Sequence, residues 1–150
     1  MSGALDHSPA DIVATLLIAL GLGQSPTENT PTWPIFVSRE PDTPDSVITV
    51  YDTSGRLQGR FQTSGEVQEA FGIQVRVRDA SHQDGYAKAR AIAVALDESI
   101  SQESVTVDAA TYTVVDVART SGVFTLGTES PESKRNIFTI NAVASLLQTS

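Results

Sequence analysis

One junction constrains the fold more than any other feature of the sequence: a strand pattern that runs directly into a capped helix. Residues 73–79, IQVRVRD, alternate apolar side chains with glutamine and arginine, as in a β-strand with one buried face. Ser81 and Asp84 then form a capping-box-like opening, with aspartate in place of glutamate or glutamine, which predicts a helix over about 82–100. Its apolar stripe contains small residues that allow close packing onto a sheet, and it comprises Tyr86, Ala89, Ala93, Leu96 and Ile100.

The most apolar run of the chain, from Asp11 to Gly23, predicts a second helix. Ser8 suits its N-cap, Pro9 suits its first turn, and Gly21 or Gly23 suits its end. The run is too short to cross a bilayer and does not follow a basic signal-peptide region, so we expect no membrane segment. Because this helix is apolar on nearly every side, we expect it deep in a core or covered by a second subunit.

The remaining chain predicts strands and turns. Residues 34–40 and 46–52 are joined by a short proline-containing turn, which predicts an antiparallel pair. Residues 53–69 hold three glycines and few apolar residues, and they predict a disordered loop, an extruded hairpin or a binding loop. Four further strands are expected at 104–108, 111–118, 122–127 and 136–147. This order predicts a single α+β domain, residues 1–150, whose mainly antiparallel sheet is packed by the N-terminal helix and one central helix.

The composition argues against several classes of function. With 18 acidic and 10 basic residues, the formal net charge of −8 disfavours dedicated nucleic-acid binding. The chain has no cysteine, so it has neither disulfides nor thiolate chemistry. We expect both histidines to be solvated, His7 near a mobile N-terminus and His82 in the first turn of a helix. Since no zinc, nucleotide-binding or hydrolase motif occurs either, we assign no catalytic, cofactor-binding or metal-binding residue and expect no enzyme.

Arg76 and Arg78 are the remaining candidates for a functional contact. Side chains two apart on a strand project from the same face, about 7 Å from each other, so the pair forms a small positive strip. The strip suits either a solvated sheet face, with the arginine stems covering apolar surface, or an ionic contact to an acidic neighbour. The sequence assigns no acidic partner to either arginine.

Three blocks of the sequence resemble siphophage minor capsid and tail-terminator proteins. Residues 33–55, WPIFVSREPDTPDSVITVYDTSG, resemble their strand, proline-aspartate turn and second strand ahead of a glycine-containing loop. Residues 73–96 resemble their next block, in which a strand with alternating arginines enters a helix with a tyrosine-x-x-alanine start. Residues 112–144 resemble their closing strands, with an LG turn and an arginine-containing connection. The order and spacing of the blocks carry the resemblance.

The resemblance implies a structural virion protein, whose subunits form a hexameric ring that caps the tail tube, stops tail polymerisation and offers a docking surface to the head. The implied partners are further copies of the chain, the tail tube protein and the head-closure protein, with DNA passing through the lumen without specific binding. The implied location is the tail or neck of the virion, after synthesis in the cytoplasm of the bacterial host. Candidate interface residues are Arg76, Arg78 and Arg119, together with Arg56, Arg60 and Phe61 in the 53–69 segment.

Two alternative functions stay open at this stage. The nearer one is another phage neck component, a head-closure or head–tail adaptor protein. The other is a small-molecule-binding domain or an enzyme in which residues 53–69 act as a lid. For the interface hypothesis, replacing Arg76 and Arg78 with alanine is expected to impair assembly and to leave the melting temperature nearly unchanged.

Overall fold

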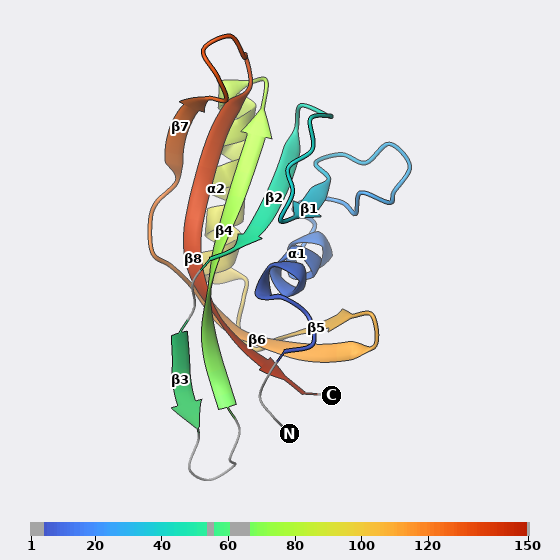
Figure 1. Cartoon of the computed structure of the whole chain (residues 1–150), viewed down its shortest axis with the longest axis vertical. Coiled ribbons are helices and arrows are strands. Elements are labelled where there is room, and N and C mark those ends of the chain that lie inside the picture. The colour runs from blue at the N-terminus through green and yellow to red at the C-terminus, as the bar shows by residue number, and fades with distance from the viewer. Residues whose placement is uncertain (1–4, 54–55, 61–66, 150) are drawn as a thin grey trace.

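The computed structural model describes residues 5–53, 56–60 and 67–149. Within these residues the chain has the expected α+β fold, in which two helices pack on a curled, mostly antiparallel sheet of eight strands (Figure 1). The helices are α1 (Pro9–Ala19) and α2 (His82–Glu98). The strands are β1 (Ile35–Val37), β2 (Val47–Asp52), β3 (Arg56–Arg60), β4 (Val67–Asp79), β5 (Glu103–Val107), β6 (Ala110–Arg119), β7 (Phe124–Thr128) and β8 (Asn136–Gln148).

Two long strands, β4 and β8, form the centre of the sheet. They pair antiparallel from Glu69↔Leu146 to Asp79↔Asn136, and the strand order across the sheet is β1-β2-β4-β8-β6-β5. On its other side β8 pairs with β7 over its first residues and with β6 over its last ones. Two different strands therefore share one edge of β8, and β7 lies at one end of the molecule beside the start of β8 (Figure 1).

Both helices begin where the sequence predicts. The Ser8 side chain accepts a hydrogen bond from the Asp11 N–H, and the Ser81 side chain accepts one from the Asp84 N–H. α1 ends at Ala19, and Gly21, which follows the C-cap Leu20, has a φ of 80° in the left-handed region that glycine adopts most easily. The Gly21 and Leu22 N–H groups bond back to carbonyls in the last turn, which is the Schellman arrangement.

The two helices cover the same face of the sheet. α2 packs on β4, β8 and β6, whereas α1 packs on β1, β2, β4 and β5. α1 buries Ile12, Val13, Leu16 and Leu17, so the predicted apolar helix lies deep in the subunit core. The stripe of α2 is also buried, except that Tyr86 is an exposed residue whose ring lies edge-on to Phe138, 6.0 Å away between centroids.

The expectation of an antiparallel pair over residues 34–52 is wrong. β1 and β2 are parallel, with Ile35 opposite Ile48 and Val37 opposite Val50. The intervening residues are too many for a tight hairpin turn, and they carry the chain back past β1 before β2 begins. This 38–46 loop is fixed by side-chain bonds to its carbonyl groups, which local sequence patterns do not reveal.

Of the three forms considered for residues 53–69, the described parts show a hairpin. β3 pairs antiparallel with the first part of β4, with Arg56 opposite Ala70 and Arg60 opposite Val67. The hairpin projects from the body of the subunit, at the opposite end from the β7 strand (Figure 1). Phe61 lies outside the described residues.

His7 is not the solvated residue that the sequence suggests. Its Nδ1 lies 2.6 Å from the Tyr112 hydroxyl and its Nε2 lies 3.1 Å from Asp108 Oδ2. The main-chain N–H of Asp6 also donates to Gln148 Oε1, so side chains of the C-terminal half hold the start of the chain. These contacts join residues 101 to 142 positions apart, and no local pattern predicts them. His82 is exposed, as expected.

Candidate assembly surfaces

Arg76 and Arg78 lie on the sheet face opposite the helices, as their alternation predicts. Across that face Arg76 is in register with Thr49 of β2 and Thr139 of β8, and Arg78 is in register with Val47 and Ile137. Residues Val47, Thr49, Ile137 and Thr139 are all buried although no helix covers them. The 38–46 loop is bound to this end of the sheet through Arg78, so the strip is not a simple solvated face.

Arg78 has its partners inside its own subunit. It is 1% exposed, and its guanidinium donates to the carbonyl oxygens of Asp42 (3.3 Å), Pro44 (2.6 Å) and Asp45 (3.3 Å). Its Nη1 also lies 3.7 Å from Glu40 Oε2 and 3.6 Å from Glu129 Oε2. A buried cation needs this kind of compensation, because transfer from water is costly unless charges and hydrogen bonds replace the hydration.

A second arginine, Arg135, extends this network. Its guanidinium donates to Glu129, and it contacts both the carbonyl and the carboxylate of Asp42. Arg135 thereby ties the turn between β7 and β8 to the 38–46 loop. We call the set Arg78, Arg135, Glu40, Glu129 and Asp42 the arginine clamp. The sequence analysis missed Arg135 because its partner Asp42 is 93 positions away.

Arg76 is less enclosed than Arg78. Its side chain is 31% exposed, and its Nε lies 3.4 Å from Glu40 Oε1. Burial and the nearby Glu40 carboxylate raise the pKa of Tyr51, while Arg76 and Arg78 oppose that rise. The acidic partner that the sequence could not assign is therefore Glu40 for both arginines.

The other predicted interface residues are distributed over two further places. Arg119 donates to both carboxylate oxygens of Asp97, at 2.9 and 2.7 Å, which lowers the pKa of Asp97 mainly through these hydrogen bonds. Arg56 and Arg60 belong to the projecting β3 hairpin, at the opposite end of the molecule from β7 (Figure 1). The fold therefore does not bring the five described candidates together in one site.

β7 is a candidate assembly surface that the sequence analysis did not identify. Among the described residues it pairs only with β8, so its outer edge is open. All five of its residues are exposed, and Phe124 and Leu126 are 52% and 58% exposed. The strand carries no charge and no proline, the features that usually protect an edge from pairing with another chain. Its one available sequence signal was two large apolar residues at alternate positions of a short strand.

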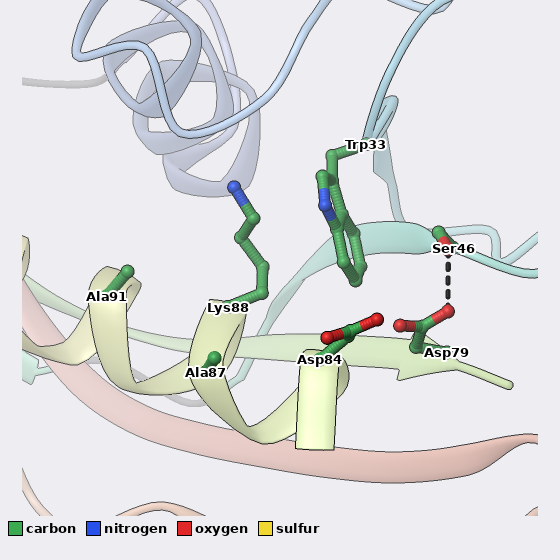
Figure 2. A pocket seen from close by; sticks show the side chains of 7 residues that line it. All are labelled: Trp33, Ser46, Asp79, Asp84, Ala87, Lys88 and Ala91. Atoms are coloured by element: carbon green, nitrogen blue, oxygen red, sulfur yellow. Dashed lines mark hydrogen bonds between the residues drawn. The ribbon is translucent and has the colours of Figure 1, made fainter. Parts of the chain in front are cut away.

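A hollow lies beside the N-terminal half of α2 (Figure 2). Its volume is about 430 Å³, and its lining comprises Trp33, Ser46, Asp79, Asp84, Ala87, Lys88 and Ala91. The Asp79 carboxylate accepts a 2.6 Å hydrogen bond from the Ser46 hydroxyl. No group of histidine and acidic side chains in the described part of the chain could hold a metal ion. No helix of the described chain is long and apolar enough to span a membrane.

Comparison with known proteins gives a family assignment. A family model described as "Bacteriophage tail terminator protein" matches residues 16–148. A solved structure known only by a sequence identifier has the same fold, with a TM-score of 0.50, 14% identity, and coverage of 96% of this chain and 99% of that chain. A chain from the "virion of native gene transfer agent (GTA) particle" gives a TM-score of 0.43 at 10% identity, over 77% of this chain and 78% of that one. No curated protein matches significantly.

Proposed function

Because the chain belongs to the bacteriophage tail terminator family, we propose that it forms a ring that caps the tail tube, stops its polymerisation and offers the head a docking surface. The observation that carries this proposal is the family match over residues 16–148, nearly the whole chain. The suspected resemblance is confirmed, and the protein is a structural component of a phage tail. The family is one of structural virion proteins and not of enzymes, so the expectation of no enzyme is confirmed.

The proposed ring needs two different surfaces on each subunit. A closed ring of identical subunits uses heterologous contacts, in which one surface of each copy meets another surface of the next. The open apolar edge of β7 would supply one surface. The opposite side of the subunit, beside β1 and β2, would supply the other (Figure 1). We propose six subunits per ring and that residues 1–150 act as one domain.

The six predicted interface residues enter this proposal in different ways. Arg56 and Arg60 belong to the projecting hairpin, which would reach the tube or a neighbouring subunit. We propose the same contact for Phe61, which lies outside the described residues. Arg76 and Arg119 are partly exposed and could form rim contacts. Arg78 is buried in its own subunit, so its contribution to assembly would be indirect, through the position of the 38–46 loop.

The charge of the chain suits the proposed lumen. A net charge of −8 disfavours binding to the phosphate backbone, so DNA would pass through such a ring without specific contacts. The protein would be made in the host cytoplasm and would become part of the tail or neck of the virion. Its other partners would be the tail tube protein on one side and the head-closure protein on the other.

The proposal is tested by light scattering and negative-stain images of the purified chain, alone and with its tail tube protein. Rings of about six subunits, or decoration of tube ends, are the expected result. A chain that ignores tubes but binds the portal side of the head would instead indicate a head-closure or adaptor role. A stable monomer that ignores tubes and binds a metabolite would overturn the proposal.

A further inference from the structure

We propose that the hollow beside Trp33 receives a cationic side chain, Arg39 or Lys134, from a second copy of the chain. The inference rests on the proposed ring, and it gives that ring a specific ionic contact. The hollow combines two carboxylates, an indole ring and space, and its own lysine is bound elsewhere.

The carboxylates of Asp79 and Asp84 lack a cationic partner in the described parts of the subunit. Asp79 is 6% exposed, and its Oδ1 accepts from the Ser46 hydroxyl at 2.6 Å and from the Ala80 N–H at 2.8 Å. Its Oδ2 has no hydrogen-bond partner among the described residues. Both carboxylates line the hollow, and Figure 2 shows them below the indole of Trp33. Asp79 favours a positive ligand, because its carboxylate is largely removed from water and is not neutralised. Asp84 is exposed and adds a second negative charge to the lining of the same hollow.

Lys88 does not neutralise these carboxylates, although it lines the same hollow. Its Nζ donates to the Leu22 carbonyl at 3.0 Å and lies 5.4 Å from the centre of the Trp33 ring. In Figure 2 the ammonium group points away from Asp79 and Asp84. Burial lowers the pKa of Lys88, and no carboxylate opposes that effect. The acidic side of the hollow is therefore left for a cation from outside the subunit.

The indole wall is held in place by the backbone around it. Trp33 has a φ of 52°, a left-handed conformation that is unusual for a bulky residue. A side chain on Gly23 would come within 2.5 Å of the Trp33 carbonyl, so only glycine allows this close approach. A cation that enters beside Asp84 would find the carboxylates and the indole already in place, and the face of the indole also attracts positive charge. The short side chains of Ala87 and Ala91 leave room for it.

A second copy of the chain is the occupant that the charges favour. Most basic side chains that the structure describes bond within the subunit, among them Arg76, Arg78, Arg119 and Arg135. Three others, Arg39, Arg90 and Lys134, are exposed, and none of their side chains makes a hydrogen bond or ion pair with a described residue. Arg90 is on α2 and acts electrostatically on Asp97, which leaves Arg39 and Lys134 as the candidates. They lie on the two loops that Arg135 joins, which the clamp holds in fixed positions. An exposed cation on a fixed loop is well suited to enter an acidic hollow of its neighbour.

The test uses charge reversal with rescue, read out by ring assembly and by the fluorescence of Trp33, the only tryptophan of the chain. On assembly of the wild-type chain, we expect the indole emission to shift to shorter wavelength and acrylamide quenching to fall. Asp84→Lys is expected to weaken subunit association at least about tenfold and to abolish this change. Combining it with Arg39→Glu or Lys134→Glu should restore both. Asp116→Lys, the same charge change at an exposed position of β6, is the matched control and should assemble normally.

The outcomes separate this inference from the proposed function. If the wild-type chain forms rings but Trp33 quenching does not change, or if Asp84→Lys assembles normally, the inference is overturned and the ring stands. Loss of assembly in Asp84→Lys that neither reversed residue rescues overturns the second copy as the occupant. A wild-type chain that forms no ring, with or without tail tubes, overturns the proposed function as well as the inference.

Discussion

The arginine clamp and the β7 edge lie beside the same few residues of β8, but the clamp is buried and bonded within the subunit whereas the outer β7 edge is exposed and, within the described chain, unpaired. Arg78 is opposite Ile137 of β8, and Gly127 of β7 is opposite the same residue from the other side. In the clamp, the central guanidinium is 1% exposed and donates to three carbonyl groups of its own subunit. In β7, the backbone edge is open and Phe124 and Leu126 are more than half exposed.

The difference shows that charge in a sequence is a poor guide to which residues stay available for contact with another chain. The two arginines of β4 attracted the interface hypothesis because they are rare in an acidic chain. The fold uses Arg78 internally to bind the loop carbonyls that a broad, irregular loop leaves without partners. The outer backbone groups of the uncharged strand β7 are unpaired among the described residues, so they can bond to another chain. Exposed apolar residues on such an edge are the usual sign of a contact.

The largest expected effect on the isolated subunit is that of Arg78→Ala. It removes three hydrogen bonds to carbonyl groups and one of the two cations near each of Glu40 and Glu129, which keep only Arg76 and Arg135 respectively. Breaking a buried ion pair from one side costs about 3–5 kcal/mol of unfolding free energy, which urea denaturation would measure. Arg76→Ala is the control, with a loss of about 1 kcal/mol or less because its side chain is 31% exposed. Equal effects of the two substitutions would remove the distinction between them.

This prediction replaces the sequence-based expectation that both arginines could be removed at little cost in melting temperature. That expectation treated them as equivalent, since period-two alternation places them on the same face but says nothing of what covers it. The alternation, the caps at Ser8 and Ser81 and the α+β class are all local features, and the structure confirms them. The parallel β1–β2 pairing, the Asp42–Arg135 contact and the His7–Tyr112 contact join distant residues, which no single-sequence pattern determines.

A smaller loss of stability is expected for Arg135→Met, which tests the outer part of the clamp. The substitution removes charge-assisted bonds to Glu129 and Asp42 but keeps an apolar stem over the loop. Because the Arg135 side chain is 18% exposed, water can replace part of the lost bonding, and we expect about 1–2 kcal/mol by urea denaturation. Lys134→Met, the adjacent exposed residue, should change stability by less than about 0.5 kcal/mol. A Lys134 effect as large as that of Arg135 would contradict the clamp.

Arg119→Ala is expected to have a still smaller effect on stability and a clear effect on titration. The hydrogen bonds from Arg119 hold the pKa of Asp97 below its usual value, so the pair stabilises the fold above about pH 4 and loses that contribution as the pH falls through the lowered pKa. In the variant, the Asp97 pKa should rise toward its usual value, as NMR titration would show. The pair is exposed, so the stability change should stay below about 1 kcal/mol. An unchanged Asp97 pKa would show that the pair does not persist in solution.

The smallest effect on the subunit is expected at the β7 edge, where the effect on assembly should be large. Phe124→Thr with Leu126→Thr keeps the β-propensity of the strand and removes side chains that bury little within the subunit, so the unfolding free energy should change by no more than about 1 kcal/mol. Ring formation, measured by light scattering, should be lost because the apolar contact and its open edge act together. Val94→Thr, at an exposed apolar position on α2, is the matched control and should assemble normally. If the β7 variant forms rings as well as the wild type does, the edge is not a subunit contact. If the variant unfolds instead, β7 stabilises the subunit as the clamp does, and the two regions do not differ in the way proposed.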